Sequence, residues 1–124
     1  MSASRSASIA FLLFALALLG GCAPAERPQT EQEALAKKIE SRIKLPDGAR
    51  PLDSYGRNYA FADDGTIVAV YATPHWPTDA KEGESRWHES YEALPRIMDG
   101  GCSVISVSYN PETDDLFVGC NGVA

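Results

Sequence analysis

The stretch R-N-Y-A-F-A-D-D-G-T-I-V-A-V-Y-A-T, residues 57–73, decides the fold that the sequence predicts. It contains two runs rich in aromatic and β-branched residues, Arg57 to Ala62 and Thr66 to Thr73, a composition typical of β-strands. Between them lies D-D-G, Asp63 to Gly65. Asp-Gly is a strong hairpin signal because both central positions of the turn require a positive φ. We therefore expect two antiparallel strands. The second is apolar on both faces, which favours a central place in the sheet.

A second hairpin is predicted toward the C-terminus. Its strands run from Cys102 to Tyr109 and from Leu116 to Cys120, joined by N-P-E-T-D-D. Apolar residues alternate with serines along the first of these strands, so one face should be buried and the other half solvated. Folding about the turn brings Cys102 roughly opposite Cys120. A disulfide between them would stabilise the domain by about 3 kcal/mol.

A helix is expected before the first hairpin. Thr30 and Glu33 form the T-x-x-E pattern that caps a helix start. Apolar residues recur at every fourth position from Leu35 to Ile43, which makes one apolar stripe. Pro46 ends the pattern because proline cannot continue a helix.

A second, short helix is expected to begin near Ser85, a residue suited to capping. Trp87, Tyr91 and Leu94 then follow at spacings of four and three, which places them on one helical face. The order helix, hairpin, helix, hairpin favours an antiparallel sheet. The sequence thus predicts a small α+β domain: a four-stranded antiparallel sheet from two hairpins, with the N-terminal helix and the short helix packed on it.

The N-terminus has the features of an export signal. A polar start with Arg5 precedes an unbroken apolar run, Ile9 to Leu19. As a helix this run would reach roughly 17 Å against about 30 Å of hydrocarbon, so it is too short to span a membrane. It ends in L-G-G-C, Leu19 to Cys22, which resembles the lipobox of bacterial lipoproteins. The resemblance implies cleavage before Cys22 and attachment of a diacylglycerol to its thiol, usually with a further acyl chain such as palmitate on the new amine.

This resemblance divides the chain into three parts. Residues 1–21 would be a signal peptide that is removed, 22–29 the lipidated N-terminus and linker, and 30–124 a single α+β domain. In lipoproteins an aspartate directly after the cysteine tends to retain the protein in the inner membrane. Ala23 stands there instead, so the resemblance implies an exported protein on the periplasmic face of an outer membrane.

Cysteine usage and charge agree with export. Lipidation of Cys22 would leave Cys102 and Cys120, an even pair that suits one disulfide in an oxidising compartment. Only Arg5 of the 11 basic residues precedes Cys22 and all 17 acidic residues follow it, so the processed chain would carry a net charge of −7. Such an acidic domain argues against nucleic acid as a partner. We expect it to associate with the membrane through its lipid, and with another envelope protein.

No catalytic motif is recognisable in the sequence, which lacks G-x-S-x-G, a P-loop, G-x-G-x-x-G and H-E-x-x-H. We therefore expect a non-enzymatic binding module without a cofactor. The irregular connection after the first hairpin carries the residues that we predict to contact a partner: His75, Trp76, Trp87 and His88. Tryptophan is favoured at interfaces, and long irregular segments are often functional. A core role for Trp87, on the expected helix stripe, is the alternative.

The same segment, residues 75–92, permits a different interpretation as a metal-binding or small-molecule module. It holds six side chains of types that suit zinc or copper: His75, Asp79, Glu82, Glu84, His88 and Glu89. Their spacing matches no known metal motif, and a solvated acidic loop with two surface histidines is the simpler interpretation. We therefore predict no metal site.

Overall fold

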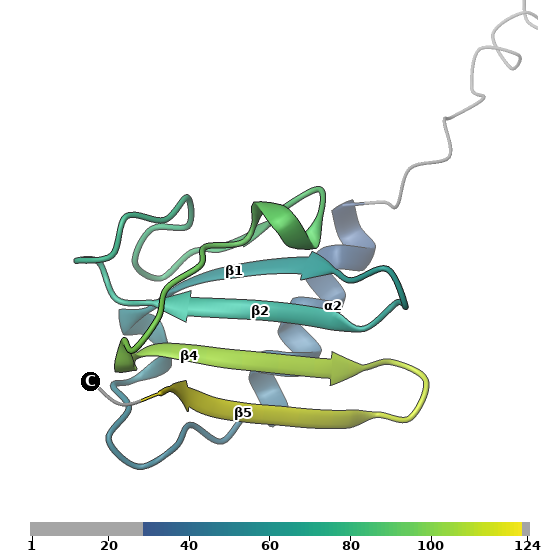
Figure 1. The fold of residues 1–124 in the computed structure, drawn as a ribbon. Helices are drawn as coiled ribbons and strands as arrows, with labels where there is room; N and C mark the ends of the chain where they lie inside the picture. Colours follow the sequence, from purple (N-terminus) through teal and green to yellow (C-terminus); the bar gives the residue numbers. More distant parts are fainter. Residues whose placement is uncertain (1–28, 123–124) are drawn as a thin grey trace, which may run out of the picture.

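The computed structural model describes residues 29–122, and the predicted signal peptide and the predicted lipidation site Cys22 lie outside this range. The described chain forms one α-helix, five strands and two 3₁₀ turns. Their bounds are α2 Gln29–Arg42, η2 Leu52–Ser54, β1 Gly56–Phe61, β2 Ile67–Ala72, β3 Ser85–Trp87, η3 Tyr91–Ala93, β4 Gly101–Asn110 and β5 Asp115–Asn121. The strands form one sheet in the order β3-β1-β2-β4-β5, with α2 behind it in the view of Figure 1.

Both predicted hairpins are confirmed. β1 pairs with β2 in antiparallel register from Gly56 opposite Ala72 to Phe61 opposite Ile67. β4 pairs with β5 from Tyr109 opposite Leu116 back toward the cysteines, which form the predicted disulfide. The hairpins join through β2 and β4, which are also antiparallel, so β2 is central as its apolar composition indicated.

The predicted second helix is wrong, and so is the four-stranded, purely antiparallel sheet. Residues 85–87 form β3, which pairs in parallel with β1 and makes the sheet five-stranded and mixed. The edge of β1 offers backbone partners: the Arg57 N–H donates to the Glu84 carbonyl, and the His88 N–H donates to the Tyr59 carbonyl, both at 2.8 Å. These long-range bonds outweigh a weak local helix preference. Only the 3₁₀ turn η3 retains helical backbone in this segment.

Helix α2 covers one face of the sheet. Ala36 and Ile39 are buried on it, and Leu35 and Ile43 of the predicted stripe pack against the same core. Thr30 lies inside the helix, so it is not the predicted cap. The C-terminal end of the helix is held to the β4–β5 turn by an ion pair of 2.7 Å between Arg42 and Asp114.

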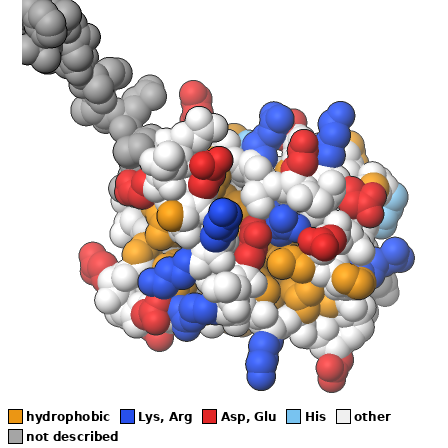
Figure 2. Space-filling view, turned by 180° about the vertical axis from the view of Figure 1, so that it is seen from behind, with side chains coloured by type: hydrophobic (Ala, Val, Ile, Leu, Met, Phe, Trp, Pro, Cys, Tyr) orange, Lys and Arg blue, Asp and Glu red, His pale blue; other side chains and the backbone are white. Residues whose placement is uncertain are grey.

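The core lies between α2 and the sheet. Alternate residues of the three central strands point into it, and all are almost completely buried: Tyr59, Ile67, Ala69, Tyr71, Ile105, Val107 and Tyr109. Figure 2 shows the outer surface on this side of the molecule, where Lys and Arg are interspersed with Asp and Glu.

No α-helix of residues 29–122 covers the opposite face of the sheet. The connection from β3 to β4, residues 88–100, crosses in front of it, as Figure 1 shows, and leaves much of β2, β4 and β5 uncovered. Leu94 of this connection is buried. Gly100 lies so close to Val104 that a Cβ at position 100 would come within 2.6 Å of its side chain. The connection therefore closes only part of this face.

Candidate functional site

His75 and Trp76 lie together at the start of the connection that follows β2. Their rings are 4.8 Å apart, and the Trp76 indole N–H donates to the Ser103 hydroxyl at 2.9 Å. His75 shares a hydrogen bond of 3.0 Å with Thr73 through its Nδ1. His75 is exposed and Trp76 is half-buried. The pair therefore sits beside the start of β4, with one polar contact anchoring the indole.

His88 is a well-bonded interior residue rather than a surface histidine. Its Nε2 donates to the Asn58 side-chain oxygen at 3.0 Å, and that oxygen also accepts the Ala80 N–H at 3.2 Å. Its Nδ1 lies 3.7 Å from the Asp79 carboxylate, and only 8% of the side chain is exposed. Asn58 is completely buried. His88 and Asn58 together hold the 74–84 connection against β1.

Gly56 shows how closely this connection approaches the sheet. A Cβ at this position would lie 2.1 Å from the Ala80 carbonyl oxygen. Only glycine permits that approach, because any side chain would displace the backbone of the connection.

Trp87 lies on the helix side of the sheet edge. Its ring stacks on those of Tyr59 and Phe61, with both centroid separations 5.1 Å. Its Nε1 is buried and has no hydrogen-bond partner among the described residues. Trp87 thus has the core role considered as the alternative, and it contacts the opposite face of the sheet from His88.

The four predicted contact residues therefore do not form one patch in the described structure. His75 and Trp76 lie next to β4 through Ser103, whereas Trp87 and His88 lie on and just after β3 at the far edge, with β1 and β2 between. A role for any of them in partner binding stays a prediction.

A polar network that the sequence analysis missed lies under α2. One carboxylate oxygen of Glu40 accepts from the Tyr59 hydroxyl at 2.7 Å, the Ser85 hydroxyl at 2.8 Å and the Arg57 Nε at 3.0 Å. Tyr71 shares a hydrogen bond of 2.6 Å with Tyr59. Burial is the main cause that raises the pKa of both tyrosines, so both hydroxyls stay protonated and act as donors. The network ties helix, central strands and edge strand together.

One signal for this network is present in the sequence. Arg57 alternates with Tyr59 and Phe61 along the first strand, so a charged side chain shares a face with two aromatic rings. A charge directed into a core requires a partner. The identity of the partner, Glu40, depends on a contact between α2 and β1 that the local pattern does not specify.

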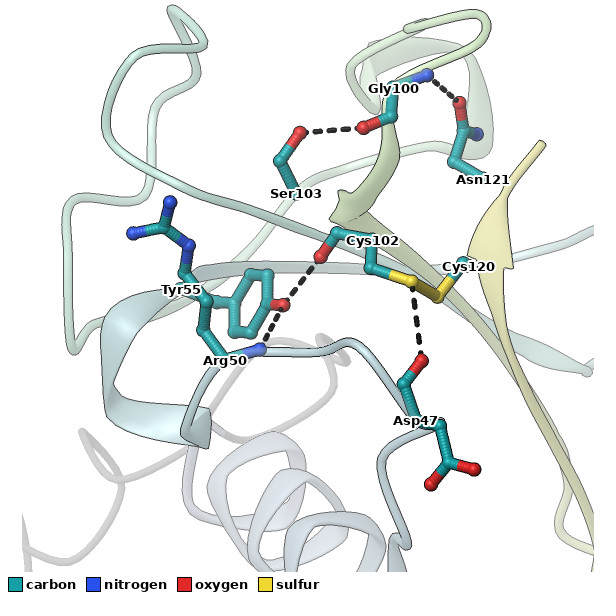
Figure 3. The surroundings of a disulfide bond; sticks show 8 residues. All are labelled: Asp47, Arg50, Tyr55, Gly100, Cys102, Ser103, Cys120 and Asn121. Atoms are coloured by element: carbon teal, nitrogen blue, oxygen red, sulfur yellow. Dashed lines mark hydrogen bonds between the residues drawn. A yellow bond between two sulfur atoms is a disulfide. The ribbon is translucent and has the colours of Figure 1, made fainter. Parts of the chain in front are cut away.

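The disulfide lies toward the opposite edge of the sheet, between β4 and β5. Figure 3 shows Cys102 and Cys120 beside Tyr55, whose hydroxyl accepts the Arg50 N–H at 3.0 Å and donates to the Cys102 carbonyl at 2.6 Å. The strand register is irregular here: Gly101 pairs with Asn121, whereas Ile105 pairs with Cys120. The disulfide therefore joins β5 to the part of β4 that has left the regular ladder.

The uncovered face of the sheet forms a groove with a volume of about 360 Å³. Val68, Val70, Ser106 and Ser108 form its floor, all of them half-buried. The walls come from the 88–100 connection on one side and from β5 on the other, and they consist mainly of Tyr91, Leu94, Ile97 and Phe117. Apolar walls over a floor that carries hydroxyls suit a binding surface.

No group of three histidine, cysteine, aspartate or glutamate side chains in residues 29–122 could hold a metal ion. The histidines of the 75–92 segment are directed to Thr73 and Asn58. No observation on the described residues favours the metal-binding interpretation. The described part of the chain also contains no helix long and apolar enough to cross a membrane.

Comparison with known proteins identifies no relative. No protein family matches the sequence, and no curated protein and no solved structure is significantly similar to it.

Proposed function

We propose that this chain is an exported lipoprotein, held by Cys22 to the periplasmic face of an outer membrane, whose domain binds another envelope component without catalysing a reaction. The observation that carries the proposal is the pairing of Cys102 with Cys120. Of the three cysteines in the sequence, this pairing leaves Cys22, which ends the L-G-G-C run. A disulfide suits an oxidising compartment, and a leftover cysteine in an exported chain suits lipidation.

The length of the linker supports a domain that works close to a lipid surface. Helix α2 begins at Gln29, and an extended chain from Cys22 to that residue spans at most about 25 Å. Each buried methylene of an acyl chain contributes about 0.8 kcal/mol, so two or more chains make a stable anchor. The domain would reach only partners located at the same membrane.

Two observations support a binding role for the domain. The described surface contains an open apolar groove, whereas the interior polar groups Glu40, Arg57 and Asn58 bond to one another or to backbone. The large exposed apolar side chains of the domain are Tyr91, Met98 and Phe117, and two of these line the groove. Exposed apolar surface of this kind marks interaction sites.

Metabolic labelling with a radioactive fatty acid tests the anchor. We expect label on the wild-type chain and none on Cys22→Ser. The double variant Cys102→Ser/Cys120→Ser is the matched control, because it also replaces cysteine by serine but should keep the label. Equal label on the wild type and on Cys22→Ser would overturn the proposal.

A further inference from the structure

The groove on the uncovered face of the sheet is open because its floor and its walls are only partly packed. Val68 and Val70 of β2 are half-buried, although their strand neighbours Ile67 and Ala69 are 1% exposed on the helix face. On the walls, Tyr91 is 47% exposed and Phe117 is 63% exposed. These apolar side chains border one continuous groove.

The groove has a charged end. Tyr91 also lines an adjoining hollow whose other walls are Ala62, Asp63, Asp64 and Glu92. None of these three carboxylates forms an ion pair within residues 29–122, where the ion pairs involve other acids. The Thr66 N–H donates to Asp64 and is the main cause that lowers its pKa, so this carboxylate is ionised at neutral pH. The end of the groove next to Tyr91 is therefore negative.

The opposite charge is represented by a single side chain. Among the described residues, Arg96 is the one charged residue that lines the groove itself, and it is exposed. Three carboxylates against one guanidinium give the groove and its end a net negative charge. A bound segment with a positive charge beside its apolar residues would match both features.

We propose that this groove binds an extended, apolar segment of another protein that carries lysine or arginine next to its apolar residues. The inference rests on the proposed binding function and names the surface and the chemistry of the partner. The apolar side chains of the segment cover Val68, Val70 and Phe117, and its cation lies at Asp63 and Glu92. The Ser106 and Ser108 hydroxyls on the floor are placed to bond the backbone of the segment.

Charge argues against two other occupants of the groove, a second copy of this chain and an anionic lipid. The chain carries a net charge of −6, so a second copy would bring a second negative groove end against the first. An anionic lipid headgroup or a fatty-acid carboxylate would also meet the carboxylates at the end of the groove. These carboxylates lie near the N-terminal half of α2, the helix that follows the linker from Cys22. Asp64 shares a hollow with Glu31 and Leu35 of that helix. This end is therefore repelled by an anionic membrane surface.

Fluorescence anisotropy with two labelled peptides tests the inference. The first is KKSLVYLS and the second, EESLVYLS, replaces both lysines by glutamate. The full chain is held in nanodiscs of phosphatidylcholine, with empty discs as the blank. We expect the lysine peptide to bind about tenfold more tightly at low salt. The difference should vanish in about 1 M salt, where charges are screened beyond roughly 3 Å.

Two sets of variants test the apolar wall of the groove and its charged end separately. Phe117→Ser should weaken binding of both peptides about tenfold, since it removes apolar surface that a bound peptide would cover. Its control is Met98→Ser, because the Met98 side chain is 83% exposed and does not line the groove. Asp63→Asn/Glu92→Gln removes two of the three carboxylates, so it should reduce the preference for the lysine peptide several-fold while leaving the glutamate peptide bound no more weakly. Its control is Asp53→Asn/Glu82→Gln, two exposed acids elsewhere that change the net charge equally.

Four results would overturn the inference. Equal binding of the two peptides at low salt would remove the charge argument, and unchanged binding to Phe117→Ser would place the site elsewhere. A dimer in sedimentation that Phe117→Ser dissociates would assign the groove to a second copy. Equal anisotropy on empty discs would assign the signal to lipid. Fatty-acid labelling of Cys22 is independent of all four results, so a failure of the proposed lipid anchor can be distinguished from a failure of the proposed binding groove. If the chain carries no lipid, its peptide binding would be measured without discs.

Discussion

The two faces of the central sheet are built from alternate residues of the same strands, yet they are closed to different extents. On the helix face, Ile105 and Val107 of β4 are at most 2% exposed, under α2. On the other face, Ser106 and Ser108 of the same strand are half-buried and lie in an open groove. Within the described part of the chain, the 88–100 connection is what crosses this second face.

The difference separates stability from binding. The helix face contains the apolar core, the tyrosine network and Cys120, so most of the stabilising contacts lie there. The groove face contributes fewer contacts and exposes two aromatic side chains. Since packed apolar area stabilises the fold and exposed apolar area favours association, substitutions on the two faces should act on different measurements.

The largest expected effect is that of Ile105→Ala on the helix face. Ile105 is completely buried, and truncation of such a residue leaves a cavity that lowers the free energy of unfolding by about 2–5 kcal/mol. Val68→Ala on the half-buried groove face should cost about 1 kcal/mol or less. Urea denaturation of both variants measures the difference. Similar losses in the two variants would show that the faces are packed alike.

The disulfide is expected to have the next largest effect. Cys102→Ser/Cys120→Ser removes a link between residues 18 apart in sequence, which should lower the free energy of unfolding by about 3 kcal/mol. The loss belongs to the helix face, because Cys120 packs against that core. Thermal denaturation compared with the oxidised wild type measures it. A loss well under 1 kcal/mol would mean that the hydrogen bonds of the Tyr55 hydroxyl and the strand pairing hold β4 and β5 in place without the covalent link.

Glu40→Gln tests the polar network under the helix. The substitution keeps the shape but removes the charge that Arg57 faces at 3.0 Å, so we expect a loss of about 2 kcal/mol in the free energy of unfolding. Glu33→Gln, an exposed residue of the same helix, is the matched control and should change it by less than about 0.5 kcal/mol. Equal effects of the two substitutions would show that the network is stabilised by packing rather than by charge.

High pH should act on the same network. Burial raises the pKa of Tyr59 and Tyr71 above the ordinary value of 10.0, so these groups lose their protons more readily in the unfolded chain than in the folded one. Their contribution to stability is complete below pH 10 and decreases as the pH rises above it, by about 1.4 kcal/mol per pH unit for each tyrosine. Tyr59→Phe should reduce this slope in urea titrations at alkaline pH. If the decrease in unfolding free energy per pH unit were unchanged in Tyr59→Phe, the alkaline loss of stability would not come from this tyrosine.

Elements formed by contacts between residues close in sequence were predictable, whereas elements formed by long-range contacts were not. The hairpins and the disulfide were predictable because their signals are local: Asp64-Gly65 sets one turn, and Cys102 and Cys120 close the other hairpin. β3 was not predictable, because its pairing joins Arg57 to Ser85 across residues that include a whole strand and an irregular connection. The spacing of Trp87 and Leu94 suggested one helical face, whereas they pack on opposite sides of the sheet.

The candidate binding surface was predictable only in part. Alternation of serines with apolar residues in 102–109 indicated a half-solvated face, and Ser106 and Ser108 do form the floor of the groove. Its walls, Tyr91 and Phe117, come from separate parts of the chain and meet only after the sheet has formed. The network under α2 likewise joins Glu40 to Ser85, 45 positions apart, which no local pattern specifies.

The smallest expected effect on stability is that of Phe117→Ser, and it bears most directly on the comparison of the two faces. The Phe117 ring lies over Gly119 and is 63% exposed, so its removal should change the free energy of unfolding by less than about 0.5 kcal/mol. An apolar dye that binds the native protein through the groove should lose fluorescence in this variant and keep it in Met98→Ser. If Phe117→Ser instead lowered the unfolding free energy by more than about 1 kcal/mol, the aromatic wall would be a part of the core and the two faces would not differ in role.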